Sequence, residues 1–314
     1  MRVATIDIGT NSVLLLVAEL RDGAVVPVLE RATITRLGRG VDRTRTFDPA
    51  AVEATLACLA EYAQEIGRSG AARVEVVGTS AMRDARGGEE LRDRAAALLG
   101  VAPRVISGNE EAELTFAGAL SGLDIEGPAL VFDLGGGSTE LIRGSVSAGR
   151  AAELARAVSV DVGSVRLTER CLTSDPPRPD EIAEVRRTAR AQLDAALITL
   201  GAPEPAAEIV GVAGTVTTLA AYVLGVTPYD PARVHGARIS AEAIARSARD
   251  LAAMSVAERR AIPTIEPKRA DVIVAGAVVT DEILTWARPF TRGDLIISDR
   301  GVRWGLAARL LGGG

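Results

Sequence analysis

Two acids, Asp133 and Glu140, flank three consecutive glycines and two hydroxyl residues. Glycine lets backbone N–H groups approach an anion closely, and hydroxyl groups can donate further hydrogen bonds. Carboxylate oxygens suit a hard cation such as Mg²⁺ (or Mn²⁺). Because an apolar run precedes Asp133, the pattern predicts a buried strand that ends in a phosphate-binding turn with its metal ion. The turn residues assigned to phosphate are Gly135, Gly136, Gly137, Ser138 and Thr139. A purely structural glycine hairpin is the alternative.

The same order of residue types recurs near the N-terminus. Apolar residues lead to Asp7, a hydroxyl-rich turn follows, and a second apolar run covers 13–18. Two such hairpins, one in each half of the chain, predict two similar α/β subdomains that face each other across an active-site cleft. The residues of this turn that we expect to surround the same phosphate are Gly9, Thr10, Asn11 and Ser12.

A third glycine turn follows the apolar residues 208–212 late in the chain. Its residues Gly214 and Thr215 fit another anion-binding turn. Close packing between a strand and a helix explains the same two residues nearly as well, so both interpretations stay open.

A carboxylate and an arginine complete the candidate chemistry. Glu111 lies in the first turn of a predicted helix, where the helix dipole favours an acid in any case. A phosphate–metal site nevertheless needs a group that deprotonates or orients the attacking water, and His235 is the only histidine. Arg83, just beyond Thr79 and Ser80 at a strand end, suits a clamp on the terminal phosphate; a surface salt bridge is its alternative.

Strands and helices alternate along the chain, which predicts the α/β class. Asp48 is the expected N-cap of a helix with Pro49 at its first position and Gly67 at its end. The loop 36–42 is either a surface turn or a lining of the anion site. In order, the expected strands cover 2–8, 13–20, 24–34, 74–78, 101–106, 128–133, 141–147, 151–162, 208–212 and 295–298. The expected helices cover 88–99, 110–120, 162–169, 180–200, 214–224, 240–253, 255–261, 269–286 and 301–311.

Composition and charge exclude several classes of protein. The net charge of −5 gives no general attraction to nucleic acid or membranes, so a polyanionic ligand would need a local basic surface. No apolar run is long enough to span a bilayer, and Asp7 interrupts the N-terminal one, which argues against a signal peptide. Cys58 and Cys171 match no metal or redox spacing. We therefore expect a reduced, cytoplasmic protein with no nucleic-acid or membrane partner, in which His235, Trp286 and Trp304 are structural.

Taken together, the motifs resemble the exopolyphosphatase/guanosine pentaphosphate phosphohydrolase family in its short two-domain form. This family belongs to the actin-like ATPase superfamily, with ribonuclease H-like subdomains. The resemblance covers nearly the whole chain. Its motifs are Asp7–Ser12, Gly78–Arg83, Ile106–Ala112, Asp133–Glu140, Val162–Glu169 and Pro267–Asp271.

The resemblance implies an enzyme that hydrolyses the terminal phosphoanhydride of inorganic polyphosphate, with water as acceptor and Mg²⁺ (or Mn²⁺) as cofactor. By motif position, Glu111 is the catalytic base. Asp133 and Glu140 position metal and water, and Asp7 supports the metal from the opposite subdomain. Arg83 and the hydroxyl–glycine turns hold the terminal phosphate. The resemblance also implies a homodimer. Within each chain, domain I is expected at 1–124 plus 299–314 and domain II at 125–298.

The chain departs from longer family members in two respects. It ends just after its closing helix, so we expect it to lack their C-terminal helical domains and to favour short polyphosphate. Arg300 stands where a small residue is usual. The close alternative function is conversion of pppGpp to ppGpp, which uses the same site. An actin-like small-molecule kinase and a non-catalytic sensor of polyphosphate or alarmone are the remaining alternatives.

Overall fold

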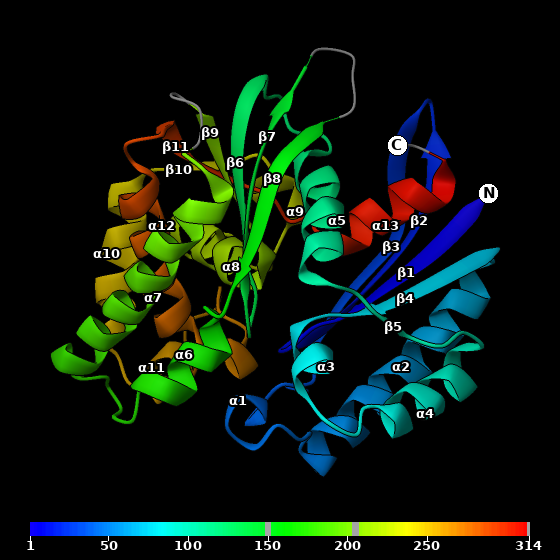
Figure 1. Ribbon diagram of the computed structural model, residues 1–314. Coiled ribbons are helices and arrows are strands. Elements are labelled where there is room, and N and C mark those ends of the chain that lie inside the picture. The colour runs from blue at the N-terminus through cyan, green and yellow to red at the C-terminus, as the bar shows by residue number, and fades with distance from the viewer. Residues whose placement is uncertain (148–151, 203–206, 313–314) are drawn as a thin grey trace. The chain divides into compact units, whose positions relative to one another are not determined.

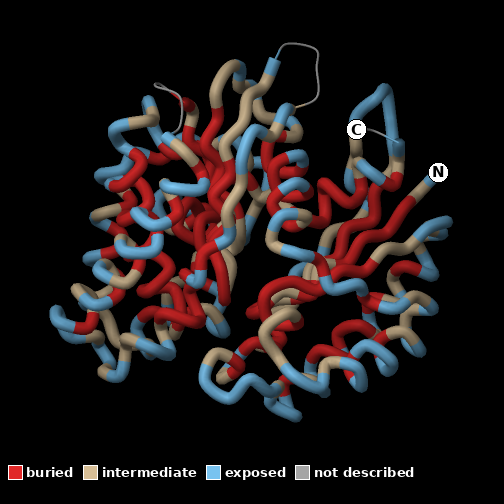
Figure 2. The backbone as a smooth tube through the Cα atoms, in the orientation of Figure 1, coloured by how far each residue is buried: buried red, intermediate tan, exposed pale blue. Residues whose placement is uncertain are grey.

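The computed structural model describes residues 1–147, 152–202 and 207–312. The chain forms two compact units, Met1–Gly118 with Val302–Gly314, and Ala119–Gly301. In each unit the strands form a buried centre (Figure 2). The domain bounds expected from the sequence stay a prediction, and their residues 148–151, 203–206 and 313–314 lie outside the described part.

The first unit is built on a five-stranded sheet in the order β3-β2-β1-β4-β5 (Figure 1). The strands β1 to β3 are antiparallel, as the turn at Asp22-Gly23 predicts, and β4 and β5 add in parallel. Only the end of the expected strand 101–106 pairs. The strands are β1 (Arg2–Ile8), β2 (Ser12–Arg21), β3 (Ala24–Ile34), β4 (Arg73–Gly78) and β5 (Arg104–Val105).

Alternation along β1 gives the first sheet two covered faces. Ala4, Ile6 and Ile8 pack with the apolar face of α2, on the side where α4 also lies. Val3 packs with Trp304 of α13 on the opposite face, and the hydroxyl of Thr5 donates to the carbonyl of Arg303 at 2.9 Å. Asp7 follows the same alternation and therefore lies on the α13 side.

Helix α2 begins where the sequence predicts, and α4, α5 and α13 begin within two residues of their predicted starts. Asp48 caps α2 by accepting from the N–H of Ala50 at 2.9 Å, and Pro49 is the first helical residue. The predicted end at Gly67 is wrong: α2 continues to Ser69 and ends at Gly70, whose φ of +69° suits glycine. The short helices α1 and α3 were not expected. The helices are α1 (Val41–Thr44), α2 (Pro49–Ser69), α3 (Ser80–Asp84), α4 (Glu89–Leu99), α5 (Gly108–Leu120) and α13 (Val302–Leu311).

The second unit has a six-stranded sheet in the order β10-β11-β9-β6-β7-β8. The strands β6 to β8 are antiparallel, whereas β9 adds in parallel beside β6 and β11 adds in parallel beside β9. The strand β11 is longer than the predicted 295–298, β10 was not expected, and residue 151 of the predicted 151–162 lies outside the described part. The strands are β6 (Gly127–Leu134), β7 (Thr139–Val146), β8 (Glu153–Val160), β9 (Ala207–Val212), β10 (Arg238–Ile239) and β11 (Thr291–Ile297).

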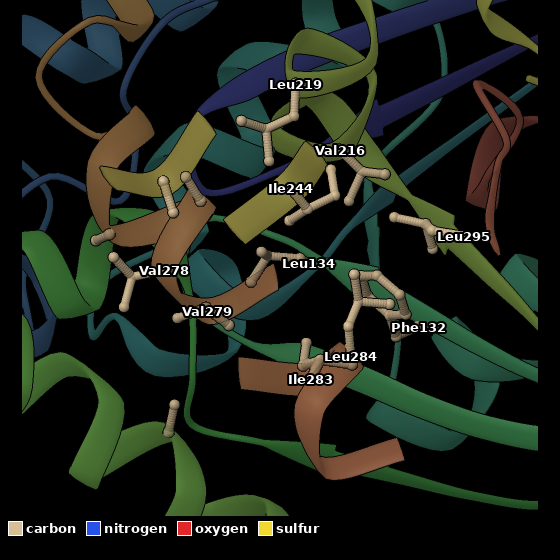
Figure 3. Close-up of a cluster of buried hydrophobic side chains, with 14 of the residues drawn as sticks. Phe132, Leu134, Val216, Leu219, Ile244, Val278, Val279, Ile283, Leu284 and Leu295 are labelled. Carbon is tan, nitrogen blue, oxygen red and sulfur yellow. The ribbon is translucent and has the colours of Figure 1, made fainter. Parts of the chain in front are cut away.

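The core of the second unit lies between this sheet and helix α12. Phe132 and Leu134 of β6 and Leu295 of β11 face apolar side chains of α8, α10 and α12 (Figure 3). Nearly all of α12 is buried. The predicted helix 269–286 is wrong in its start, because a short 3-10 turn at Pro267–Arg269 precedes it. The helices are α6 (Ser164–Cys171), α7 (Pro179–Leu200), α8 (Ala213–Leu224), α9 (Pro231–Val234), α10 (Ala241–Ala252), α11 (Val256–Arg260) and α12 (Ile273–Ala287).

The two units repeat one topology. In each, a hairpin of two antiparallel strands is followed by a third antiparallel strand, and the next strand returns in parallel on the other side of the first. Asp7 pairs with Val77 of β4, and Asp133 pairs with Val212 of β9, so the two acids hold equivalent places. The prediction of two related α/β subdomains is confirmed.

Further expectations concern single residues. Cys58 is buried and both cysteines are free. Trp286 and Trp304 are buried in their own units. No helix within the described residues has the length and apolarity needed to cross a membrane.

Candidate active site

The turn after β1 presents backbone donors. The N–H of Gly9 donates to the carbonyl of Ser12 at 3.0 Å and closes the turn. Within the described residues no backbone acceptor takes the N–H groups of Thr10 and Asn11, so both can donate to an anion. The N–H of Thr79 donates to the carbonyl of Ile8 at 3.2 Å, which brings the segment after β4 to the same edge of the sheet.

The loop 36–42 packs directly on this turn. The N–H of Gly38 donates to the carbonyl of Thr10 at 2.7 Å, and the N–H groups of Thr35 and Arg36 donate to the carbonyl of Asn11 at 3.1 and 3.0 Å. A Cβ on Gly38 would lie 2.3 Å from Cγ2 of Thr10, so glycine is required for this approach. The loop is therefore part of the structure around the turn.

Glu111 and Arg83 form an ion pair beside this edge. Nη1 of Arg83 lies 2.5 Å from Oε2 of Glu111 and donates to the carbonyl of Ile106 at 3.0 Å. Glu111 is 6% exposed, and burial raises the pKa of its carboxyl above its usual range, while the charge of Arg83 opposes the rise. A buried carboxylate with a raised pKa is suited to accept a proton near neutral pH.

The neighbouring acid Glu110 has a different environment. Its carboxylate binds Arg104 at 2.6 and 2.8 Å and Arg309 of α13 at 3.1 Å, and these arginines also bind Glu75. The arginines lower the pKa of Glu110. Of the two adjacent acids, only Glu111 has the surroundings of a base.

The turn after β6 has the same geometry as the turn after β1. The N–H of Gly135 donates to the carbonyl of Ser138 at 3.0 Å. In the part of the chain that the structure describes, the N–H groups of Gly136, Gly137 and Ser138 have no backbone acceptor. The turn can therefore present three backbone donors to an anion.

The start of α6 holds this second turn in place. The N–H groups of Val165 and Arg166 donate to the carbonyl of Gly136 at 2.9 and 3.0 Å, and Nε of the buried Arg166 donates to the carbonyl of Gly137 at 2.5 Å. Gly163 touches the same backbone: a Cβ there would lie 2.3 Å from the carbonyl oxygen of Gly136. The motif Val162–Glu169 by itself predicts no role for these residues, and in the structure they support the turn.

Asp133 and Glu140 are direct partners across the β6–β7 hairpin, so their side chains project to the same face. Oε1 of the buried Glu140 accepts from the hydroxyls of Ser138 at 3.0 Å and Ser159 at 2.7 Å. No cluster of three or more potential metal-ligating side chains occurs among the described residues. Two carboxylates match Mg²⁺, which keeps several waters and takes one or two carboxylates plus substrate phosphates.

Thr139 differs from the role expected for it. Its side chain is fully buried, and its hydroxyl donates to the carbonyl of Val162 at 2.6 Å. A threonine has one O–H donor, which is already used here. The geometry therefore gives Thr139 the task of joining β7 to the segment that leads into α6.

The third glycine turn includes an arginine that sequence reasoning left without a role. The guanidinium of Arg269 covers Gly214, where a Cβ would lie 2.3 Å from its Nη1. Burial lowers the pKa of Arg269, and no described residue forms a hydrogen bond or close ion pair with its side chain. Ala213, just before the turn, has a φ of +78°. Gly214 and Thr215, at the start of α8, thus lie beside the guanidinium of Arg269, whose positive charge can bind an anion.

One further segment reaches the same edge of the second sheet. The site of a Cβ on Gly301 is 3.8 Å from Oδ2 of Asp133. In the adjacent loop, Oδ1 of Asp299 is 3.0 Å from Nδ1 of His235, and both side chains are largely buried. Nη1 of Arg300 donates to the carbonyl of Ser121 at 2.9 Å. His235 therefore contributes to the support of this loop.

Each unit thus collects its candidate residues at the carboxyl ends of its parallel strands, where ligands of α/β proteins commonly bind. The first unit brings together Asp7, Gly9, Thr10, Asn11, Ser12, Thr79, Ser80, Arg83 and Glu111. The second unit brings together Asp133, Gly135, Gly136, Gly137, Ser138, Glu140, Gly214 and Thr215.

Comparison with known proteins agrees with this arrangement. The model of the Ppx/GppA phosphatase family matches residues 16–312. Exopolyphosphatase 2 of Mycobacterium tuberculosis is 40% identical over 322 residues, which cover 99% of each chain. A solved exopolyphosphatase-like protein superposes with a TM-score of 0.92 at 37% identity, covering 98% of this chain and 97% of its own. The Ppx/GppA family member of Aquifex aeolicus superposes with a TM-score of 0.81 at 33% identity, covering 99% and 98%.

The expected α/β fold with two similar subdomains is confirmed by these likenesses and by the repeated sheet topology. The likenesses extend through both units, so they include every turn described above. The chain belongs to the Ppx/GppA phosphatase family.

Proposed function

We propose that the protein is an exopolyphosphatase: it hydrolyses the terminal phosphoanhydride bond of inorganic polyphosphate and releases orthophosphate. Two relatives that match over nearly the whole chain carry the name exopolyphosphatase or exopolyphosphatase-like. The local geometry supports the same reaction, since phosphoryl transfer depends mainly on positioning and on stabilising negative charge.

Phosphate binding is assigned to the glycine turns. The turns after β1 and β6 offer backbone N–H groups that no backbone acceptor uses among the described residues. Arg269 at the third turn adds a positive charge. Anions bind well to such groups because several N–H dipoles point at one site. We propose that the glycine turns of each unit bind phosphate groups of the substrate.

Glu111 carries the proposal. As the base it would take a proton from the water that attacks the terminal phosphorus, while the bond from that phosphorus to the bridging oxygen breaks. Its raised pKa makes it a stronger base than an ordinary glutamate. Arg83, paired with it at 2.5 Å, fixes the carboxylate and places a positive charge where the phosphate must approach.

Asp133 and Glu140 would hold the divalent cation, Mg²⁺ or Mn²⁺, with Asp7 as a further support. When bound, such an ion neutralises charge on the phosphate oxygens. The hydroxyls of Ser138 and Ser159 donate to the Glu140 carboxylate and orient it. These two serines therefore prepare one face of the hairpin for a cation.

The test is phosphate release, in the presence of Mg²⁺, from triphosphate, long-chain polyphosphate and pppGpp. Wild type is compared with Glu111→Gln and with Glu113→Gln, which removes an exposed acid from the same helix. We expect release from polyphosphate, a fall in kcat of about 10²–10⁴-fold in Glu111→Gln, and no change in Glu113→Gln.

Other outcomes would identify the alternatives. Turnover of pppGpp alone would assign the alarmone reaction, which the family name also includes. Binding of ATP with transfer to a small acceptor would indicate a kinase. Binding of polyphosphate or alarmone without any release would refute the hydrolase and leave a sensor. A homodimer, a cytoplasmic location and the absence of nucleic-acid or membrane partners stay predictions.

A further inference from the structure

The first unit carries an exposed group of arginines next to its phosphate turn. Arg39, Arg43, Arg45 and Arg86 are all exposed. Among the described residues, none of their side chains forms an ion pair or a hydrogen bond, although most arginines elsewhere in this unit have acidic partners. We name these four residues the arginine group.

Backbone contacts hold the arginine group in one place. The N–H of Arg86 donates to the carbonyl of Arg45 at 2.8 Å, and Thr46 forms an isolated bridge with Arg86. Arg45 in turn donates its N–H to the carbonyl of Val41, closing α1. The helices α1 and α3 therefore lie side by side (Figure 1).

The arginine group also connects to the candidate active site. Its loop is anchored on the turn after β1 by the bond from Gly38 to Thr10. At the other end, Arg86 follows Arg83 by three residues, and Arg83 binds Glu111. The arginine group thus lies on segments that are attached directly to the residues assigned to the terminal phosphate.

The local charge is opposite to that of the whole chain. Residues 36–48 and 83–86 contain six arginines and three aspartates, a net charge of +3, in a chain of net charge −5. Two of the aspartates, Asp42 and Asp84, are half-buried, whereas the arginine group is exposed. Like charges held side by side repel one another, and a bound polyanion would remove that repulsion.

We propose that Arg39, Arg43, Arg45 and Arg86 bind the part of a polyphosphate chain that lies beyond its terminal phosphates. The inference rests on the proposed function and deepens it, since it assigns a binding surface to the distal part of a polyphosphate chain and so extends the substrate range beyond the short chains expected from the sequence. Arginine suits this task because its planar fork binds phosphate oxygens in pairs. Triphosphate is too short to need this surface, so its hydrolysis does not depend on these four residues.

The experiment measures binding and turnover separately. Binding of fluorescently end-labelled long polyphosphate is followed by anisotropy from 50 to 200 mM salt, in the Glu111→Gln background so that the ligand is not consumed. The double variant Arg43→Gln/Arg86→Gln is compared with Arg249→Gln/Arg288→Gln. This control removes two exposed arginines of the second unit that form no ion pair with any residue the structure describes. KM for long polyphosphate and for triphosphate is measured with the same pairs in the active protein.

Each phosphate contact contributes roughly 0.7–0.9 to the slope of log K against log[salt]. We therefore expect Arg43→Gln/Arg86→Gln to lower that slope by about 1.5 and to weaken binding on the order of tenfold at 50 mM salt. Its KM for long polyphosphate should rise in parallel, with triphosphate turnover unchanged. The control pair should leave the slope and both KM values as in wild type.

Three results would overturn the inference. The first is an unchanged salt slope in Arg43→Gln/Arg86→Gln. The second is an equal loss for triphosphate and long polyphosphate. The third is equally tight binding of a single-stranded oligonucleotide through the same arginines, which would indicate a nucleic-acid surface. The proposed hydrolase activity is refuted by a different result, namely no phosphate release from any of the three substrates.

Discussion

Gly163→Ala tests whether the turn after β6 must be held rigidly by α6. Gly163 has a φ of −151°, an extended conformation that alanine adopts without strain. The obstacle is space alone. The added Cβ would lie 2.3 Å from the carbonyl oxygen of Gly136 and 2.6 Å from the carbonyl carbon of Gly137.

The size of the effect follows from these distances. A Cβ and a carbonyl oxygen seldom approach closer than 3.0–3.4 Å, so α6 and the turn must move apart by about 1 Å. Three N–H bonds from Ser164, Val165 and Arg166 resist that movement. Overpacking of this kind costs about 1–3 kcal/mol of unfolding free energy. A misplacement of 1 Å at a reacting centre can reduce the rate about 10²-fold.

The assay is kcat/KM for phosphate release together with the unfolding free energy from urea titration. Gly67→Ala is the matched control, because Gly67 lies exposed in α2 and a Cβ there meets nothing within 4 Å. We expect Gly163→Ala to lose about two orders of magnitude in kcat/KM, and Gly67→Ala to gain up to about 1 kcal/mol in stability at unchanged activity. If Gly163→Ala had the same kcat/KM and the same unfolding free energy as wild type, the turn after β6 would not depend on close contact with α6.

The remaining predictions concern Glu111 and Arg300. Burial raises the pKa of Glu111 in the folded protein above its value of 4.5 in the unfolded chain. The protonated carboxyl therefore contributes its full share of the unfolding free energy below pH 4.5, and this share is lost as pH rises through the raised pKa. Glu111→Gln should therefore gain stability relative to wild type between pH 4.5 and 7 in urea titrations; a constant difference would contradict this. In the pH profile of wild-type kcat/KM, the midpoint of the fall on the acid side should lie above the usual range for a glutamate. A midpoint near pH 4.5 would count against Glu111 as the base. Arg300→Ser removes the bond to Ser121 and should cost about 1 kcal/mol in the same titration, which an unchanged unfolding midpoint would disprove.

Much of the fold could be predicted because its signals are local. Asp48 and Pro49 mark the start of α2 through contacts within two residues. The Asp–Gly–hydroxyl order at Asp7 and Asp133 predicts a hairpin wherever it occurs. The predicted end of α2 at Gly67 is wrong because a glycine does not have to end a helix. An exposed glycine inside a helix costs only about 1 kcal/mol, and α2 continues to Ser69.

The sequence by itself determined the two related hairpins, the alternation of strands and helices, and the residue types able to bind phosphate. Only the tertiary structure decided what each polar atom contacts. Thr139 reads as a phosphate donor, yet its hydroxyl donates to Val162. Arg269 reads as the first residue of the helix 269–286, yet it lies in a 3-10 turn and its guanidinium covers Gly214. Periodicity describes neighbours within a few residues, whereas these contacts join segments far apart in the chain, and their partners depend on how the elements pack.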